Sequence, residues 1–373
     1  MIPIYKPDLS GNEKKYVNDC LDSSWISSKG KYVDLFEKKF SDITESKFAV
    51  ACSNGTVAIH LALLALGIGK GDEVIVPSLT YIASVNPILY CGAKPVFVDC
   101  DDRDWNINVD NIEEKITKRT KAIMPVHLYG APVWIKEIIE IANKHNLYII
   151  EDCAEAFGST YDGEGRWFKV GTQCDVATYS FFGNKTVTTG EGGMVVTNNE
   201  SIYNRVQKLK GQGLSKDRQY WHDVVGYNYR MTNIACAIGY AQLERHVEIL
   251  QRKREIYDLY RDLWMEFDLP YVFQQSSSAA GYNSRWLNTI VIKESVYKKG
   301  MRDELMSYLK DKGIETRPMF YPIHTMPMYF KQYVPLPVCE NISKRGLSLP
   351  SYPLLTDEEI GIISETLKKF FER

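Results

Sequence analysis

The chain has 373 residues, of which 45% are hydrophobic and 25% are charged, and its formal net charge at pH 7 is -2. A chain of this length exceeds the size at which one hydrophobic core stops growing, so we expect two domains. The composition is that of an ordinary globular protein, and the nearly neutral charge gives no electrostatic reason to bind nucleic acid or an anionic membrane.

Helices and strands alternate in the first half of the chain. The apolar patterns predict helices at 56–66, 84–90, 111–118 and 134–145, and strands at 73–77, 95–99, 122–128, 147–152, 176–182 and 194–197. Apolar strands separated by helices indicate an α/β domain with a mainly parallel sheet covered on both faces. We assign residues 1–245 to this larger domain.

The pattern changes after residue 197. We predict a helix at 201–209, a polar segment at 210–229, one extended helix from about 232 to 264 and a surface loop at 270–284. The apolar segments 289–292 and 314–318 then alternate with predicted helices at 300–312 and 356–371. This second pattern indicates a smaller α+β domain over residues 246–373.

Targeting signals and metal-binding motifs are not evident. Segment 1–7 has no charged region followed by an apolar core, and the longest apolar runs, such as 58–66, reach about half a membrane span. The eight cysteines are scattered and form no Cys-x-x-Cys pair. Scattered cysteines favour reduced thiols over a zinc site or a disulfide framework, so we expect a cytoplasmic protein without a metal.

Lys185 lies in a glycine-rich turn between the strands predicted at 176–182 and 194–197. A lysine held between two strands is poorly placed to be a solvated surface charge. It is well placed to form a Schiff base with a carbonyl cofactor. Taken alone, the position is more often explained by an ordinary lysine in a turn, and the features upstream favour the cofactor interpretation.

Asp152 ends an apolar strand, and in open α/β sheets ligands gather at the carboxyl ends of the strands. A carboxylate there could keep the pyridine nitrogen of pyridoxal phosphate protonated, which makes the ring an electron sink. The alternative is a helix N-cap, because segment 153–156 could begin a helix.

Three further positions fit a phosphorylated aromatic cofactor. Gly55 and Thr56 begin a predicted helix, where free backbone N–H groups form an anion site, although simple capping is the commoner explanation. Tyr81 follows a strand end and could stack on a pyridine ring. Ser180 precedes Lys185 and could donate a further hydrogen bond to phosphate.

Together, and in this order, these features resemble the sugar aminotransferases of the DegT/DnrJ/EryC1/StrS type, which are fold-type I pyridoxal phosphate enzymes. The resemblance covers nearly the whole chain. Its most specific segments are 22–28, 77–84, 124–130, 180–193, 226–233 and 317–324. It implies a large domain with a mainly parallel seven-stranded sheet and a smaller C-terminal α+β domain.

The resemblance also implies roles for individual residues. The cofactor would be bound by Gly55, Thr56, Tyr81, Asp152, Glu155, Ser180, Lys185 and Asn228. Within this set Lys185 would be the catalytic residue bonded to the cofactor, and Glu155 would lie near the ring hydroxyl. Asn228 would reach the phosphate of the neighbouring subunit, so a homodimer with shared active sites is expected.

Substrate contacts are implied for Trp25, Arg317, Tyr321 and His324, all of which lie in segments that resemble the borders of the family's active site. Arg317 could contact a carboxylate or a phosphate. His324 lies near two prolines and is equally well explained as a loop histidine that bonds within the protein.

The reaction implied by the resemblance is amino transfer from L-glutamate to a nucleotide-linked 4-keto-6-deoxy sugar, with pyridoxamine phosphate as the intermediate form of the cofactor. GDP-4-keto-6-deoxy-D-mannose, aminated at C4 to GDP-perosamine for surface polysaccharides such as O-antigen, is the favoured substrate. A UDP- or dTDP-linked 4-keto-6-deoxyglucose, giving a viosamine-type product, stays open. A 3-dehydratase of the same family would carry histidine where this chain has Lys185.

Two other classes of protein compete with this interpretation. A dinucleotide-binding reductase could use the glycines at 67–71, but these follow a predicted helix, whereas the dinucleotide fingerprint needs a strand before its loop. A regulator with an aminotransferase-like domain would need a DNA-binding module, and we find no basic helix-turn-helix pattern.

Overall fold

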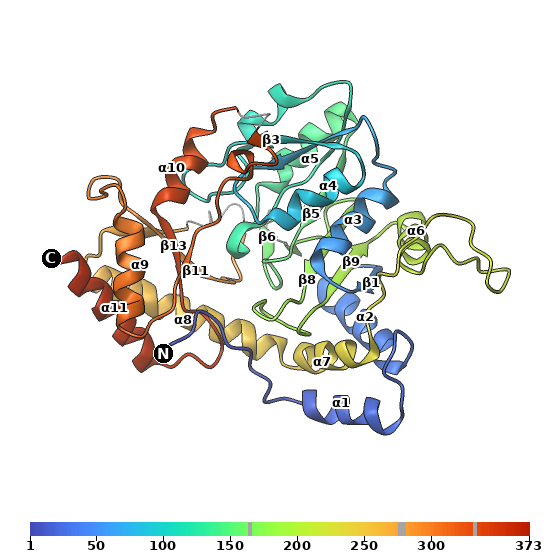
Figure 1. Ribbon diagram of the computed structural model, residues 1–373, viewed down its shortest axis with the longest axis horizontal. Helices are drawn as coiled ribbons and strands as arrows, with labels where there is room; N and C mark the ends of the chain where they lie inside the picture. The colour runs from blue at the N-terminus through green and yellow to red at the C-terminus, as the bar shows by residue number, and fades with distance from the viewer. Residues whose placement is uncertain (163–165, 275–280, 331–333) are drawn as a thin grey trace.

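The computed structural model describes residues 1–162, 166–274, 281–330 and 334–373. Its larger part is built on a seven-stranded sheet (Figure 1). The strands are β1 (Phe48–Cys52), β2 (Glu73–Pro77), β3 (Lys94–Val98), β4 (Thr120–Ile123), β5 (Tyr148–Asp152), β8 (Val176–Ser180) and β9 (Gly193–Thr197). They run in the order β1-β9-β8-β5-β4-β2-β3, and β9 is antiparallel to both of its neighbours, while β8, β5, β4, β2 and β3 are parallel. The predicted mainly parallel sheet is confirmed.

Helices cover both faces of this sheet. They are α1 (Glu13–Asp22), α2 (Lys31–Thr44), α3 (Gly55–Ala65), α4 (Asn86–Tyr90), α5 (Ile135–His145), α6 (Glu200–Lys210) and α7 (Asn233–Glu244). Apolar residues of α2, α5 and α7 pack in one core, and those of α3, α4 and α6 pack in another. Successive strand residues such as Ala49 and Val50 enter opposite cores, as the two-residue period of a strand requires.

Helix α3 shows how the sequence builds the site. The Asn54 side chain caps it by accepting a 3.0 Å hydrogen bond from the amide of Val57. The helix is apolar on all sides, and seven of its residues are buried. Such a helix must lie inside the protein, and its first turn is thereby held next to the sheet.

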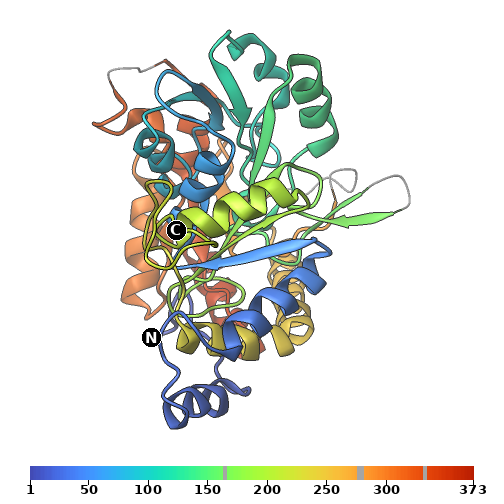
Figure 2. The same ribbon diagram turned by 90° about the vertical axis from the view of Figure 1, so that its right-hand side faces the viewer.

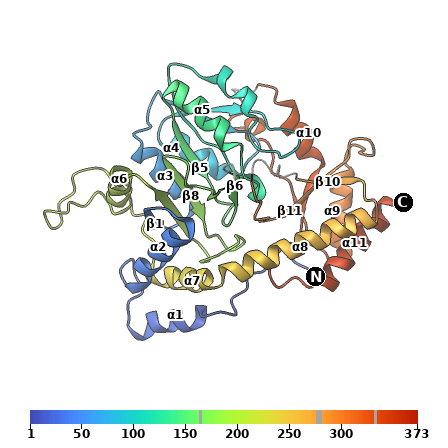
Figure 3. The same ribbon diagram turned by 180° about the vertical axis from the view of Figure 1, so that it is seen from behind.

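The smaller part of the chain has a four-stranded antiparallel sheet. Its strands are β10 (Tyr271–Phe273), β11 (Asn288–Ile292), β12 (Arg317–Pro318) and β13 (Gly346–Leu349), in the order β10-β11-β13-β12. Helices α8 (His246–Glu266), α9 (Met301–Asp311), α10 (Pro337–Arg345) and α11 (Asp357–Phe371) belong to this part, and α8, α9 and α11 share one apolar core with the sheet. Seen from behind, α7 and α8 follow one another along one side of the molecule (Figure 3).

The start of the chain joins the smaller part. Ile2 forms a parallel bridge with Ile314, and the Ile2 amide donates to the Gly313 carbonyl at 2.7 Å. A two-stranded hairpin of β6 (Thr160–Asp162) and β7 (Trp167–Lys169) projects from the larger part (Figure 2). We retain the domain boundary between 245 and 246 as a proposal, since Arg245 separates α7 from α8.

Three sequence predictions are wrong in detail. Residues 111–118 do not form an α-helix but two short 3-10 turns, Val109–Asn111 and Glu113–Lys115, because the chain must turn into β4 and Thr117 bonds to Glu73 at 2.6 Å. The helix predicted at 232–264 is broken at Arg245, which has a φ of -108° and a ψ of 10°.

The third error is the surface loop predicted at 270–284. Tyr271–Phe273 is strand β10, and Gln274, Asn283 and Ser284 are buried. The polar side chains of this segment suggested a surface loop. Gln274 is nevertheless buried, because its side chain donates to the backbone carbonyls of Asp104 and Leu128 inside the protein. Residues 275–280 of this prediction lie outside the described residues. Within the described ranges, no helix has the length and apolar character needed to cross a membrane.

Candidate active site

A cavity of about 630 Å³ lies where the parallel strands β2, β4, β5 and β8 end. This volume is typical of a small-molecule site. Seven of the eight residues predicted to bind the cofactor line it: Gly55, Thr56, Tyr81, Asp152, Glu155, Ser180 and Lys185. The fold therefore brings together side chains that are up to 130 positions apart in sequence, from Gly55 to Lys185.

The turn that carries Lys185 is held by three hydrogen bonds. The Lys185 amide donates to the carbonyl of Phe182 at 2.8 Å, and the Tyr5 hydroxyl donates to the carbonyl of Lys185 at 2.7 Å. The indole N–H of Trp286 donates to the carbonyl of Asn184 at 2.6 Å. Two of these donors come from the N-terminal arm and the smaller part, so the lysine turn is fixed between distant segments of the chain.

The Lys185 side chain is almost buried and faces Glu155. Its Nζ lies 3.5 Å from Glu155 Oε1, with exposed fractions of 13% and 5% for the two side chains. Burial lowers the pKa of Lys185, and the negative charges of Glu155 and Asp152 oppose this shift. Burial likewise raises the pKa of Glu155 to about 7, against the effect of Lys185. Both shifts favour the neutral forms of the two groups, and a neutral amine is the form of lysine that can accept a proton.

Asp152 lies at the end of β5 and is buried. Ser84 Oγ donates to its Oδ2 at 2.7 Å, and the Ala154 amide donates to its Oδ1 at 3.0 Å. Burial raises the pKa of Asp152, although both hydrogen bonds and the charge of Lys185 oppose the rise. A cationic N–H beside this carboxylate would offset its burial.

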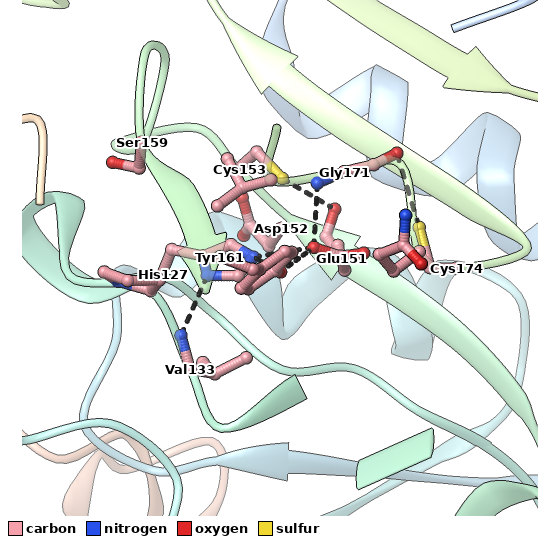
Figure 4. Close-up of polar contacts among 12 residues, drawn as sticks. His127, Val133, Glu151, Asp152, Cys153, Ser159, Tyr161, Gly171 and Cys174 are labelled. Carbon is pink, nitrogen blue, oxygen red and sulfur yellow. Dashed lines mark hydrogen bonds and ion pairs between the residues drawn. The ribbon is translucent and has the colours of Figure 1, made fainter. Parts of the chain in front are cut away.

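A second buried network lies behind Asp152 (Figure 4). Glu151 accepts from the Gly171 amide at 2.8 Å, contacts His127 Nε2 at 3.0 Å and accepts a very short hydrogen bond from Tyr161. The Val133 amide donates to His127 Nδ1 at 3.2 Å, so the proton of a neutral His127 sits on Nε2, facing Glu151. Burial would raise the pKa of Glu151, but these hydrogen bonds outweigh it and lower the pKa.

This network also contains a group of side chains with metal-binding chemistry, namely His127, Glu151 and Cys153. The His127 ring and the Glu151 Oε2 atom are already engaged in the hydrogen bonds above, and burial raises the pKa of the Cys153 thiol far above its usual range. A metal needs a deprotonated thiolate and free lone pairs, so we interpret the group as a structural network.

The part of the cavity wall formed by the start of α3 is suited to an anion. Gly55 and Thr56 form the first turn of α3, whose backbone N–H groups have no acceptor within the helix. A Cβ atom at Gly55 would lie 2.9 Å from the Cβ of Ser180, so a larger residue would fill the space between helix and strand. Glycine is therefore needed for the close approach of α3 to β8.

These residues fit pyridoxal phosphate. The cavity offers a lysine for the aldehyde, a buried carboxylate whose pKa is raised by burial and which a cationic N–H would stabilise in its ionised form, and a helix start for the phosphate. Tyr81 adds an aromatic ring that is 56% exposed and lies 5.6 Å from the ring of Phe320. Its exposed face is available for stacking.

Four predicted residues are not among the described residues that line this cavity: Trp25, Asn228, Tyr321 and His324. Trp25 and Tyr321 are exposed, while His324 is buried and bonds to Ser78 at 2.6 Å and to Glu340 at 3.2 Å. His324 therefore has the internal bonds of a loop histidine. Of the predicted substrate contacts, Arg317 does line the cavity.

Sequence reasoning missed Ser84, Tyr129 and Trp286, which also line the cavity. The Tyr129 amide donates to Glu155 Oε2 at 2.8 Å and so orients the partner of Lys185. A serine in the segment that follows Tyr81 was a weak signal for Ser84, but no local pattern relates Trp286 to Lys185. Their contact depends on how the two parts of the chain pack.

Comparison with known proteins identifies the family of the chain. The profile of the DegT/DnrJ/EryC1/StrS aminotransferase family matches residues 7–368. The GDP-perosamine synthase of Escherichia coli O157:H7 is 54% identical over 370 residues, covering 99% of this chain and 98% of the relative. The GDP-perosamine synthase of Vibrio cholerae is 48% identical over 373 residues, covering 100% and 99%.

Solved structures show the same architecture. Spr1654 from Streptococcus pneumoniae in its PLP form superposes with a TM-score of 0.93 at 28% identity, covering all of this chain and 98% of the other. S. venezuelae DesV in complex with a ketimine intermediate superposes with a TM-score of 0.90 at 31% identity, covering 100% and 99%.

Proposed function

The chain belongs to the DegT/DnrJ/EryC1/StrS aminotransferase family, and from this premise we propose that it is a GDP-perosamine synthase. It is a pyridoxal phosphate-dependent enzyme. In the proposed reaction the amino group of L-glutamate moves to C4 of GDP-4-keto-6-deoxy-D-mannose. Identities of 54%, 48% and 47% to three GDP-perosamine synthases over nearly the full chain support this choice of sugar nucleotide.

The observation that carries the amino-transfer chemistry is Lys185 inside the cavity, with its Nζ 3.5 Å from Glu155 Oε1 and Asp152 acting on it as a second negative charge. When bound, the cofactor supplies an electron sink that makes the α-hydrogen of the amino donor acidic. We propose that Asp152 accepts the N–H of the pyridine ring, and that Gly55, Thr56 and Ser180 bind the phosphate. Tyr81 would stack on the ring, and Glu155 would lie near its hydroxyl.

Lys185 is the proposed base. Its Nζ would take the proton from the α-carbon of L-glutamate and would later deliver a proton to C4 of the sugar. A lysine can accept a proton only when neutral, and burial moves Lys185 in that direction by lowering its pKa. A histidine here would support the family's dehydration instead, so Lys185 favours amino transfer.

We further propose a homodimer in which each active site uses residues of both copies. Asn228 and Trp25 lie outside the cavity of their own chain, as contacts to a neighbouring site would require. The segment after α6 projects away from the sheet (Figures 1 and 3), and it carries the exposed residues Tyr220, Trp221 and Val225. Exposed aromatic and aliphatic side chains of this kind are typical of a protein interface.

A cytoplasmic location completes the proposal. All eight cysteines are unpaired, and six of them are buried. Reduced thiols are expected in a reducing compartment.

Product analysis with L-glutamate and three keto sugars, offered side by side, tests this function. The GDP-, UDP- and dTDP-linked 4-keto-6-deoxy sugars differ in the nucleotide, and the latter two also carry the glucose-type sugar. We expect a 4-amino product from the GDP compound alone. Turnover confined to a UDP or dTDP compound would refute the perosamine assignment but leave the aminotransferase class intact, whereas a product that has lost a hydroxyl and carries no 4-amino group would indicate a dehydratase.

A further inference from the structure

Trp286 contacts the proposed catalytic lysine directly. Lys185 Nζ lies 3.8 Å from the centroid of the Trp286 ring. Trp286 is 3% exposed, and it lines the cavity next to Leu287, just before β11. An ammonium group this close to an indole is attracted by the negative face of the ring.

Three contacts hold Trp286 in place. Its Nε1–H donates to the carbonyl of Asn184, the residue before Lys185, at 2.6 Å. The backbone carbonyl of Trp286 accepts a 2.7 Å hydrogen bond from Nζ of Lys253, a fully buried lysine of α8 that also donates to the carbonyl of Ser351 at 2.9 Å. Tyr129 stacks beside the indole, with centroids 6.2 Å apart and an interplanar angle of 18°.

Lys185 therefore has two kinds of partner. Glu155 at 3.5 Å, with Asp152 as a further negative charge, attracts the ammonium form, whereas burial disfavours it. The indole face also attracts the ammonium form, but it carries no net charge and cannot accept the proton. An aromatic face can thus fix the position of the amine without removing its ability to exchange a proton.

We propose that Trp286 is a positioning residue for Lys185, and that its indole face holds the lysine amine whenever this amine is not bonded to the cofactor. The inference rests on the proposed function insofar as it takes Lys185 as the reacting lysine. The indole N–H bond to Asn184 couples the position of the ring to the turn that carries the lysine. Trp286 thereby links the smaller part of the chain to the amine in the cavity of the larger part.

The test uses the cofactor-free full-length protein and a small lysine-acylating reagent, pulsed at a series of pH values. Mass spectrometry of the Lys185 peptide then reports the pKa of this one lysine without any contribution from turnover. The variants are Trp286→Phe, which keeps a smaller ring but loses the indole N–H, and Trp286→Leu, which removes the aromatic face. Trp264→Phe and Trp264→Leu are matched controls. The Trp264 indole also donates to a backbone carbonyl, that of Leu269 at 2.9 Å, but Trp264 packs against the apolar core that α8, α9 and α11 form with the smaller sheet, and it does not line the cavity.

We expect the pKa of Lys185 to fall in the order wild type, Trp286→Phe, Trp286→Leu, with a total shift of about one pH unit. The Trp264 variants should keep the wild-type value. An unchanged or raised pKa in both Trp286 variants would overturn the proposal. Thermal unfolding checks that each variant is folded. If Trp286→Leu does not fold, the pKa of Lys185 in Trp286→Phe alone tests the proposal, and an unchanged or raised value there overturns it.

A separate measurement keeps this inference apart from the proposed function. Borohydride reduction of the wild-type protein after addition of pyridoxal phosphate should attach the cofactor to Lys185. Failure of this attachment would contradict the proposed function, whatever the labelling series gives. If the cofactor is attached to Lys185 but the pKa of Lys185 does not change in the Trp286 variants, the role of Trp286 is refuted and the proposed function stands.

Discussion

Replacement of Ser84 by alanine should weaken cofactor binding in a pH-dependent way. Ser84 Oγ donates to Asp152 Oδ2 at 2.7 Å, in a part of the site where both residues are buried. A hydrogen bond to a charged group contributes about 1.5–3 kcal/mol, which corresponds to a pKa shift of about 1–2 units. Ser84→Ala removes this donor and one oxygen atom, so the pKa of Asp152, already raised by burial, should rise further.

The sign of the effect follows from the charge that the cofactor needs. Only the ionised carboxylate of Asp152 can pair with a protonated ring nitrogen. The protein should therefore bind the cofactor tightly above the pKa of Asp152, and this affinity should decrease as the pH falls through that pKa. In Ser84→Ala this loss should occur about 1–2 pH units higher than in the wild type. Affinity at high pH should stay close to the wild-type value.

The assay is a titration of the cofactor-free protein with pyridoxal phosphate between about pH 5 and pH 9, followed by the visible absorption of the bound cofactor. The protonation of the cofactor phosphate affects all variants equally and cancels in the comparison. Thr80→Val is the matched control, because the Thr80 hydroxyl lies 2.8 Å from Ser84 Oγ. It should give a smaller shift. Superimposed curves for Ser84→Ala and wild type would refute the assigned link between Ser84 and Asp152.

Three further predictions concern the protonation of Lys185, the buried hydrogen-bond network around Glu151 and the proposed homodimer. Glu155→Gln removes a negative charge 3.5 Å from Lys185 Nζ, so acylation of Lys185 should begin at lower pH than in the wild type; a shift to higher pH would contradict the electrostatic pairing. Glu151→Gln should lower the free energy of unfolding by about 2–4 kcal/mol in urea titrations at pH 7, because it leaves His127 with a weaker partner. The pKa of Glu151 is lowered in the folded protein, so the difference in unfolding free energy between wild type and Glu151→Gln should be present above about pH 4.5 and vanish as the pH falls further. A difference that stays constant at all pH values would speak against an ionised Glu151. Lys185→Ala and Asn228→Ala should each be inactive alone but recover activity when refolded together, because the mixed dimer contains one intact site; no recovery despite mixed dimers on native mass spectrometry would argue against shared sites.

Much of the site was predictable because its signals are local. Asp152 ends an apolar strand, Gly55 and Thr56 begin an apolar helix, and Lys185 lies in a glycine-rich turn. Each of these positions can be identified from a few neighbouring residues. The rule that ligands gather at the carboxyl ends of parallel strands then predicts that they meet, and the cavity contains all four.

The errors came from places where local preference and tertiary context disagree. The apolar spacing at 111–118 favoured a helix, but the chain must leave this segment to enter β4, and it does so in 3-10 turns. Gln274 looked like a loop residue because it is polar, yet it satisfies buried backbone carbonyls. Hydrogen bonds to distant residues do not appear in a pattern of neighbouring residues.

The sequence by itself determined the fold class, the alternation of helices and strands, and the residue types at the ends of the strands. These depend on periodicity and on chain geometry, which act over a few residues. Only the tertiary structure decided that Trp286 faces Lys185, that Glu151 and His127 bond behind Asp152, and that His324 lies outside the cavity. Such contacts join segments more than twenty residues apart, and their partners are selected by packing and by the need of buried polar groups for hydrogen bonds.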